Sequence, residues 1–159
     1  MRSRRLAAWI SALLLLAHAA LAQEEELPSL DEFFEKGTLI IETGDLGCFK
    51  FDIHIATSYE QQRRGLMFVR EMDDFAGMLF IYPRSDVHSM WMKNTYIPLD
   101  ILFVKADGLV SSIAANTEPL SLTSVSSRER VRYVLELNAG MSAKLGIDQD
   151  SRLVLTQTE

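Results

Sequence analysis

A group of polar side chains interrupts two apolar runs near the middle of the chain. Lys93, Asn94 and Asp100 lie on either side of a turn that contains Pro98, and Trp91 precedes them. A tryptophan offers a flat apolar wall, and a few charged groups fix the orientation of a bound molecule, as in most small-ligand pockets. A hairpin here would bring Lys93 close to Asp100. This stretch is the first candidate for a binding site.

The same residues also allow a purely structural interpretation. Asn94 and Thr95 can hydrogen-bond to their own backbone, as short polar side chains often do in turns. An exposed pair of Lys93 and Asp100 would contribute only about 0–1 kcal/mol. Composition alone therefore leaves both a ligand site and a plain turn open.

Two acid and histidine pairs carry the spacing of neighbours on one strand face, Asp52 with His54 and Asp86 with His88. A metal site needs three or more converging ligands, and neither pair has a third nearby in the sequence. The nucleophile elbow of hydrolases and glycine-rich phosphate loops are absent from the sequence. We therefore expect neither a metal nor a cofactor.

Cys48 is the single cysteine, so no internal disulfide can form. No histidine pattern around it suggests a catalytic thiol. Free cysteines are commonly small buried apolar residues. We predict that Cys48 is buried and dispensable.

Several stretches, which cover nearly all of the chain after its N-terminal part, form a recognisable set. They are Arg64–Phe68, Gly77–Phe80, Trp91–Thr95 with Pro98–Phe103, Arg132–Leu137 with Ala139-Gly140, and Leu145–Ile147. Together they resemble the bacterial and archaeal family called domain of unknown function 192. The resemblance implies a compact β-sandwich-like fold and brings no biochemical activity with it. It also favours one connected cluster of six candidate site residues: Trp91, Lys93, Asn94, Asp100, Arg132 and Glu136.

The elements that must position these residues are short. Apolar runs and alternating patterns predict eight strands, over residues 38–42, 49–55, 77–82, 87–92, 99–105, 109–115, 132–137 and 152–156. One short helix follows a capping box at Thr57–Glu60 and ends by Gly65, and another is capped by Asn138 and runs to Leu145. The fold class is therefore mainly β, a compact antiparallel β-sandwich or barrel-like domain of about eight short strands with two short helices.

The N-terminus has the order of a secretory signal peptide. Three arginines precede an apolar run with four consecutive leucines, and Ala20-Leu21-Ala22 offers a small-residue cleavage site. We predict a signal peptide over residues 1–22, an acidic linker over 23–36, and a single β-rich domain over 37–159. The linker contains a capping box at Ser29–Glu32, with Gly37 as the stop of a short helix. These features predict a periplasmic or secreted protein.

The charge balance narrows the possible partners. The chain carries 16 Lys and Arg against 22 Asp and Glu, and removal of the three arginines before residue 23 takes the formal net charge from −6 to −9. An acidic protein repels phosphate backbones and anionic lipid. We therefore expect no nucleic-acid partner, and no membrane span once the signal peptide is cleaved. The expected partner is a small molecule or an envelope protein, and the expected state is a monomer.

Three functional hypotheses remain open. The leading one is a non-catalytic envelope domain that binds a ligand or partner through the Trp91–Asp100 stretch. The second is an envelope enzyme in which Asp100 or Glu136 acts as acid or base, and Lys93 or Arg132 stabilises negative charge. In the third, Asp100 and Arg132 form a buried ion pair that only fixes the hairpin register. Enclosure decides between the first two, because buried converging charges favour catalysis and an open aromatic shelf favours binding.

Overall fold

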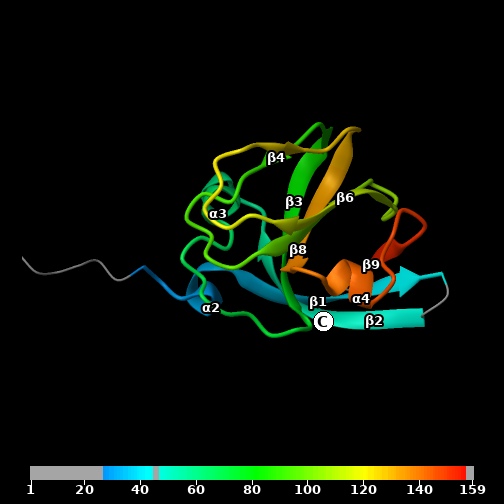
Figure 1. The fold of residues 1–159 in the computed structure, drawn as a ribbon, viewed down its shortest axis with the longest axis horizontal. Helices are drawn as coiled ribbons and strands as arrows, with labels where there is room; N and C mark the ends of the chain where they lie inside the picture. Colours follow the sequence, from blue (N-terminus) through cyan, green and yellow to red (C-terminus); the bar gives the residue numbers. More distant parts are fainter. Residues whose placement is uncertain (1–26, 45–46, 157–159) are drawn as a thin grey trace, which may run out of the picture.

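The computed structural model describes residues 27–44 and 47–156, and the protein folds there around one strongly curled sheet (Figure 1). Seven strands are ordered β6-β5-β8-β3-β2-β1-β9, and β4 pairs with β7 in a small second sheet. The strands of the large sheet are β1 (Glu35–Thr43), β2 (Gly47–Ala56), β3 (Ala76–Asp86), β5 (Leu99–Val104), β6 (Val110–Thr117), β8 (Val131–Asn138) and β9 (Arg152–Thr156). The mainly β, barrel-like fold predicted from the sequence is confirmed.

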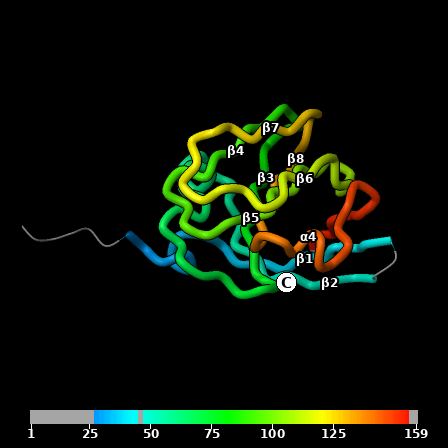
Figure 2. The backbone as a smooth tube through the Cα atoms, in the orientation of Figure 1, coloured from blue at the N-terminus to red at the C-terminus, as the bar shows by residue number. Residues whose placement is uncertain are grey.

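The two outer strands of the large sheet approach each other, which makes the fold barrel-like. The amide of Leu153 in β9 donates to the carbonyl of Gly108, which precedes β6, and the amide of Val110 donates to the carbonyl of Ser151. These bonds satisfy backbone groups that an open sheet edge would leave unpaired. The small sheet of β4 (Ser89–Met90) and β7 (Val125–Ser126) lies at the end of the molecule away from β1 and β2 (Figure 2).

Three short helices accompany the strands in the described part of the chain. They are α2 (Leu30–Phe33), α3 (Tyr59–Arg64) and α4 (Met141–Lys144). The predicted capping box at Ser29 and Glu32 is present. The second box forms one residue later than predicted, between Ser58 and Gln61, because the Ser58 hydroxyl and not that of Thr57 accepts the Gln61 amide.

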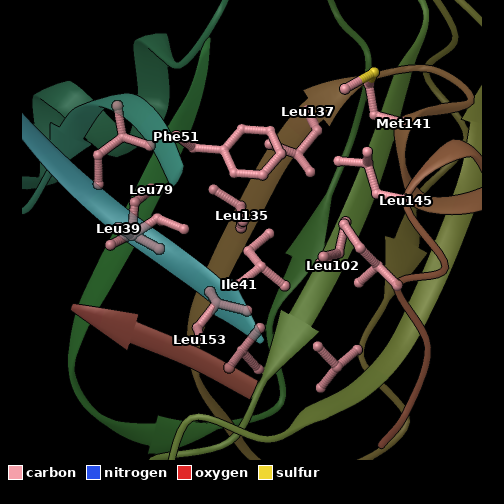
Figure 3. Packing of buried hydrophobic residues seen from close by; sticks show 14 residues of the cluster. Leu39, Ile41, Phe51, Leu79, Leu102, Leu135, Leu137, Met141, Leu145 and Leu153 are labelled. Atoms are coloured by element: carbon pink, nitrogen blue, oxygen red, sulfur yellow. The ribbon is translucent and has the colours of Figure 1, made fainter. Parts of the chain in front are cut away.

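Alternation along the strands separates the buried apolar residues into two clusters. The α4 cluster fills the space between the sheet and α4, as Figure 3 shows for Leu39, Phe51, Leu102 and Leu135. The α3 cluster lies on the other side of β3, β5 and β8. Its members are Phe34, Ala56, Leu66, Met78, Phe80, Met90, Met92, Leu99, Ile101, Phe103, Val131 and Val134.

The N-terminal segment around α2 docks onto the body of the domain. Phe34 is buried in the α3 cluster, with only 4% of its surface exposed. The Gln61 side chain donates to the Phe33 carbonyl, and His54 bonds to Asp31 at 2.9 Å. Phe33 packs against the same cluster, so both phenylalanines hold this segment on the domain. The residues predicted as signal peptide, and the linker before residue 27, lie outside the described residues.

Several local predictions are wrong, each for a specific reason. Cys48 is exposed, because it lies at the start of β2 beside the hairpin turn and not in the sheet centre. The strand predicted over 77–82 is longer, because β3 continues past Pro83 to Asp86 through a register irregularity where the lost amide is tolerated. Asn138 belongs to β8 and does not cap α4, whose first flanking residue is Gly140.

Two further details differ from the sequence-based expectation. The sheet is not wholly antiparallel, because β2 and β3 pair in parallel, with α3 in the connection between them. Helix α2 ends at Phe33, ahead of the predicted stop at Gly37, because β1 already begins at Glu35. None of the helices in the described ranges is long and apolar enough to span a membrane.

Candidate functional site

The six predicted site residues do not form one cluster, because the sheet separates them. Asp100 in β5 alternates with Leu99 and Ile101, so it faces the α4 cluster. Glu136 in β8 pairs with Ile101 in the sheet register and therefore faces the α3 cluster on the opposite side. The expected convergence of these two carboxyl groups is wrong, since neighbouring positions on a strand point to opposite faces.

Asp100 is completely buried and fully engaged in hydrogen bonds. One carboxylate oxygen accepts the Asn116 amide at 2.8 Å, and the other accepts the Ser142 amide at 2.9 Å and the Ser142 hydroxyl at 2.5 Å. These donors tie β6 and α4 to β5. The predicted exposed pair with Lys93 is wrong, because Asp100 has no contact with solvent.

The proposed ion pair between Asp100 and Arg132 is also absent from the described part of the chain. In the sheet register Asp100 lies opposite Leu137, five positions away from Arg132. At about 3.3 Å per residue this is a separation on the order of 16 Å. The four ion pairs of the described residues involve neither group. Arg132 lies on the Glu136 face, and its Nε is buried without a hydrogen-bond partner in the described structure.

Glu136 is the opposite case, a buried carboxyl group without a partner. Only 4% of its surface is exposed, and no group of the described residues hydrogen-bonds to it. Its neighbours across the ladder are Met78 in β3 and Ile101 in β5, which are both apolar and buried. Burial raises the pKa of Glu136 to about 8, so the group is mostly protonated at pH 7.

A cavity of about 90 Å³ opens above Glu136, between α3 and the chain that leads from β4 towards β5. Trp91 and Lys93 line it together with Glu136, so three of the six predicted residues share one site. Its remaining walls come from α3 and the loop after it, from β3, and from β4. They comprise Gln62, Arg63, Arg64, Gly65, Leu66, Met67, Phe80, Tyr82, Ser89, Met90 and Thr95.

A wider groove of about 700 Å³ adjoins this cavity and shares Trp91, Lys93 and Arg64 with it. Asn94 lines the groove and adopts a left-handed conformation with φ of 57°. Its carbonyl accepts the Phe68 amide at 2.7 Å, which fastens this turn to the loop after α3. Asn94 therefore shapes the entrance to the cavity.

Lys93 and Trp91 form the exposed rim of the cavity. The Lys93 Nζ lies 5.3 Å from the centre of the Trp91 ring, within the range of a cation–π contact. Trp91 is 47% exposed. An exposed tryptophan edge beside a free ammonium is suited to contact a ligand with an apolar part and an anionic part.

Arg64, at the end of α3, is the principal residue that sequence reasoning missed. Its guanidinium lies 4.7 Å from the centre of the Phe33 ring, and its Nη2 donates to the Pro28 carbonyl. Its Nε and Nη1 are buried without a hydrogen-bond partner among the described residues. Gly65 directly after it has φ of 48°, and a Cβ there would approach the Phe80 ring to 3.2 Å. The Arg64-Gly65 pair, already part of the family resemblance, was the available signal.

Tyr82 in β3 supplies the other wall that sequence reasoning did not identify. Its ring stacks on His88, with 3.5 Å between the ring centres, and its hydroxyl donates to the Met90 sulfur at 3.8 Å. Burial and the nearby Glu136 raise the pKa of Tyr82 to about 12. The phenol therefore stays neutral at physiological pH. In the described ranges, no three His, Cys, Asp or Glu side chains converge as metal ligands.

Comparisons with known proteins agree with this architecture. A crystal structure described as that of a proposed transcription regulator from Sinorhizobium meliloti 1021 is 38% identical, with a TM-score of 0.75, and the match covers 77% of this chain and 95% of that one. A crystal structure of a protein of unknown function from Novosphingobium aromaticivorans DSM 12444 is 36% identical, with a TM-score of 0.74, and covers 76% and 86%. A comparison with curated proteins gives no match.

The family model named DUF192, with the description Uncharacterized ACR, matches residues 40–155. The match spans part of β1, all of β2 to β8, nearly all of β9, both α3 and α4, and every residue that lines the smaller cavity. Residues 1–39 precede the match and include the first part of β1 and the segment that contacts Arg64. The chain therefore belongs to the DUF192 family.

Proposed function

We propose that the protein binds a small organic molecule in the cavity between α3 and Trp91. The observation that carries this proposal is Glu136, a buried and unpartnered carboxyl group at the floor of an open cavity. A buried polar group without a hydrogen bond costs about 1–3 kcal/mol. A ligand that hydrogen-bonds to Glu136 would recover this cost. The unpaired carboxyl group therefore favours a ligand-binding cavity over a cavity that stays empty.

The walls of the cavity support the same proposal. Trp91, Met67 and Met90 provide apolar surface, and Lys93 and Arg64 provide charge. This combination of apolar walls and a few polar groups is typical of ligand sites. Asp100, by contrast, is no longer a candidate ligand-binding residue, because its oxygens already accept hydrogen bonds from Asn116 and Ser142.

An enzyme is the second candidate, and Glu136 is the reason to keep it. A carboxylic acid with a pKa of about 8 can donate or accept a proton near neutral pH. Arg64 and Lys93 line the same cavity and could stabilise negative charge on a reacting molecule. Asp100 and Arg132 have no part in this version, because neither lines the cavity.

We further propose that the domain works in the periplasm or outside the cell. The support is the signal-like sequence of residues 1–22. Mass spectrometry of the protein from an envelope fraction should find Gln23 as the first residue, and intact residues 1–22 on most molecules would contradict export by cleavage. The description of the Sinorhizobium neighbour as a regulator is not transferred, since a net charge of −6 disfavours contact with DNA.

The ligand site can be tested by NMR with a neutral planar probe, benzamide. In the full chain with Trp9→Phe, Trp91 is the only tryptophan, so the spectrum has one indole N–H signal. Benzamide should shift this signal and the Gly65 amide in a saturable way. The Gly108 amide should not move, because Gly108 lies at a different cavity beside β9.

Two alanine variants provide the matched comparison. Trp91→Ala should weaken benzamide binding at least about tenfold, as judged from the Gly65 amide, because it removes the apolar wall. Tyr59→Ala removes an aromatic residue that is 78% exposed and lines neither cavity, and it should leave binding unchanged. Equal binding by wild type and Trp91→Ala would contradict the proposed site.

A further inference from the structure

We propose that the ligand of this cavity is an organic anion, whose carboxylate or phosphate group is held by Arg64 and Lys93 while its planar apolar part lies against Trp91. This inference rests on the proposed function and names the chemical class of the ligand.

The first support is the local charge. Arg63, Arg64 and Lys93 all line the cavity, although the chain as a whole carries a net charge of −6. The carboxylates of the described residues do not neutralise them, because every described ion pair uses other cations, namely Lys36, His54, Lys105 and Lys144. Three unpaired cations around one cavity create a local positive potential that attracts anions.

The second support is the state of Arg64. One of its terminal nitrogens, Nη2, is occupied by the Pro28 carbonyl, and the guanidinium is held against the Phe33 ring. Its Nε and Nη1 remain buried donors without a partner among the described residues. Both nitrogens belong to one charged guanidinium, and each can donate a hydrogen bond to an oxygen of a carboxylate or phosphate. The contacts with Pro28 and Phe33 hold the guanidinium in place and leave these two donors for an anion.

The third support is Glu136, which at first appears unfavourable for an anion. The charged and titratable groups that line the cavity with it are Arg63, Arg64, Tyr82 and Lys93. Because burial keeps Glu136 largely protonated at pH 7, its hydroxyl can donate a hydrogen bond. A neutral carboxylic acid next to unpaired cations favours an acceptor-rich anionic group over a donor-rich cationic one.

Four probes of similar shape separate these possibilities: benzoate, phenylphosphate, benzamide and benzamidine, titrated at pH 7 and followed through the Trp91 indole and Gly65 amide signals. At least one of the two anions should bind about tenfold or more tightly than neutral benzamide. Cationic benzamidine should bind most weakly. The tighter of the two anions identifies the head group as a carboxylate or a phosphate.

Charge variants test whether the named cations cause the preference. Lys93→Gln and Arg64→Gln should each reduce the affinity for the preferred anion about fivefold or more and leave benzamide nearly unchanged. Lys50→Gln, on the exposed surface of β2, is the control and should change neither. Lys93 is exposed, so its variant will fold even if Arg64→Gln disturbs the N-terminal segment.

The outcomes distinguish this inference from the proposed function. Equal binding of benzamide and both anions, or an anion preference that survives Lys93→Gln, would overturn the anion assignment and leave the ligand site standing. Failure of all four probes to shift the Trp91 and Gly65 signals would count against the ligand site itself.

Discussion

Two buried carboxyl groups on opposite faces of the same sheet show how differently one residue class can be used. Asp100 is 0% exposed and accepts three hydrogen bonds, from the Asn116 amide and from the amide and hydroxyl of Ser142. Glu136 is 4% exposed and accepts none from the described residues. The first is a structural connection between β5, β6 and α4, and the second lies at the floor of a cavity.

The difference shows that burial alone does not identify a functional group. A buried carboxylate with a full set of donors stabilises the fold around it, because each donor would otherwise be left unpaired. A buried carboxyl group without donors lowers stability in its charged form, and a fold retains such a group more readily when it serves a ligand. The partners of a side chain therefore carry more functional information than its depth.

The largest expected effect is at Asp100. Asp100→Ala should lower the free energy of unfolding by about 4–6 kcal/mol, because it leaves three donors unsatisfied at a buried site, two of them on Ser142. Urea denaturation of the full chain measures this. Asp52→Ala, an exposed aspartate on β2, is the control and should cost less than about 0.5 kcal/mol. Similar losses for Asp100→Ala and Asp52→Ala would show that the hydrogen bonds of Asp100 do not stabilise the fold.

Ser142→Ala tests how much one of these three hydrogen bonds contributes to stability. This change removes the hydroxyl donor and keeps the amide donor, so Asp100 retains two of its three bonds. The loss should be about 1–2 kcal/mol in the same urea experiment. A loss as large as that of Asp100→Ala would mean that packing around Ser142, and not hydrogen bonding, dominates.

Substitution of Glu136 should raise the free energy of unfolding at alkaline pH, whereas substitution of Asp100 lowers it. Its folded-state pKa of about 8 lies above its ordinary value of 4.5, so its neutral form contributes fully below about pH 4.5, and that contribution is lost as the pH rises through 8. Glu136→Gln removes the ionisation. The variant should gain about 2–4 kcal/mol relative to wild type between pH 5 and pH 9, a value on the order that such a pKa rise implies.

Urea unfolding of wild type and Glu136→Gln at pH 5, 7 and 9 measures this gain. The difference between the two proteins is the relevant quantity, since Tyr82 and the neighbouring cations Arg63, Arg64 and Lys93 are present in both. A difference that does not change with pH would show that Glu136 has an ordinary pKa and finds partners in solution.

The smallest expected effect concerns Asp100 and Arg132 together. Because the sheet register separates them and no ion pair joins them, their substitutions should act independently. The double variant Asp100→Asn/Arg132→Met should equal the sum of its single variants within about 0.5 kcal/mol. A coupling free energy of about 3 kcal/mol or more would show that Asp100 and Arg132 interact directly, as in the ion pair predicted from the sequence.

Local features of the fold were predictable from the sequence. The last strand was predicted over 152–156 and is β9, Arg152–Thr156. The capping box at Ser29 and Glu32 formed as predicted, and Gly65 ends α3. Such features depend on residues within about four positions of one another, so a single chain segment contains the information.

The candidate site depended on contacts that no local pattern contains. The sequence identified Trp91, Lys93 and Glu136, and placed them in one group with Asp100. Register between β5 and β8 decided that Asp100 and Glu136 face opposite sides, because a shift of one position would reverse every side chain of a strand. Arg64 joined the site through α3, which packs on the sheet from a distant part of the chain. The sequence by itself determined most of the elements and the polar residue types. Only the tertiary structure decided which polar groups meet, since strand register and helix packing are non-local.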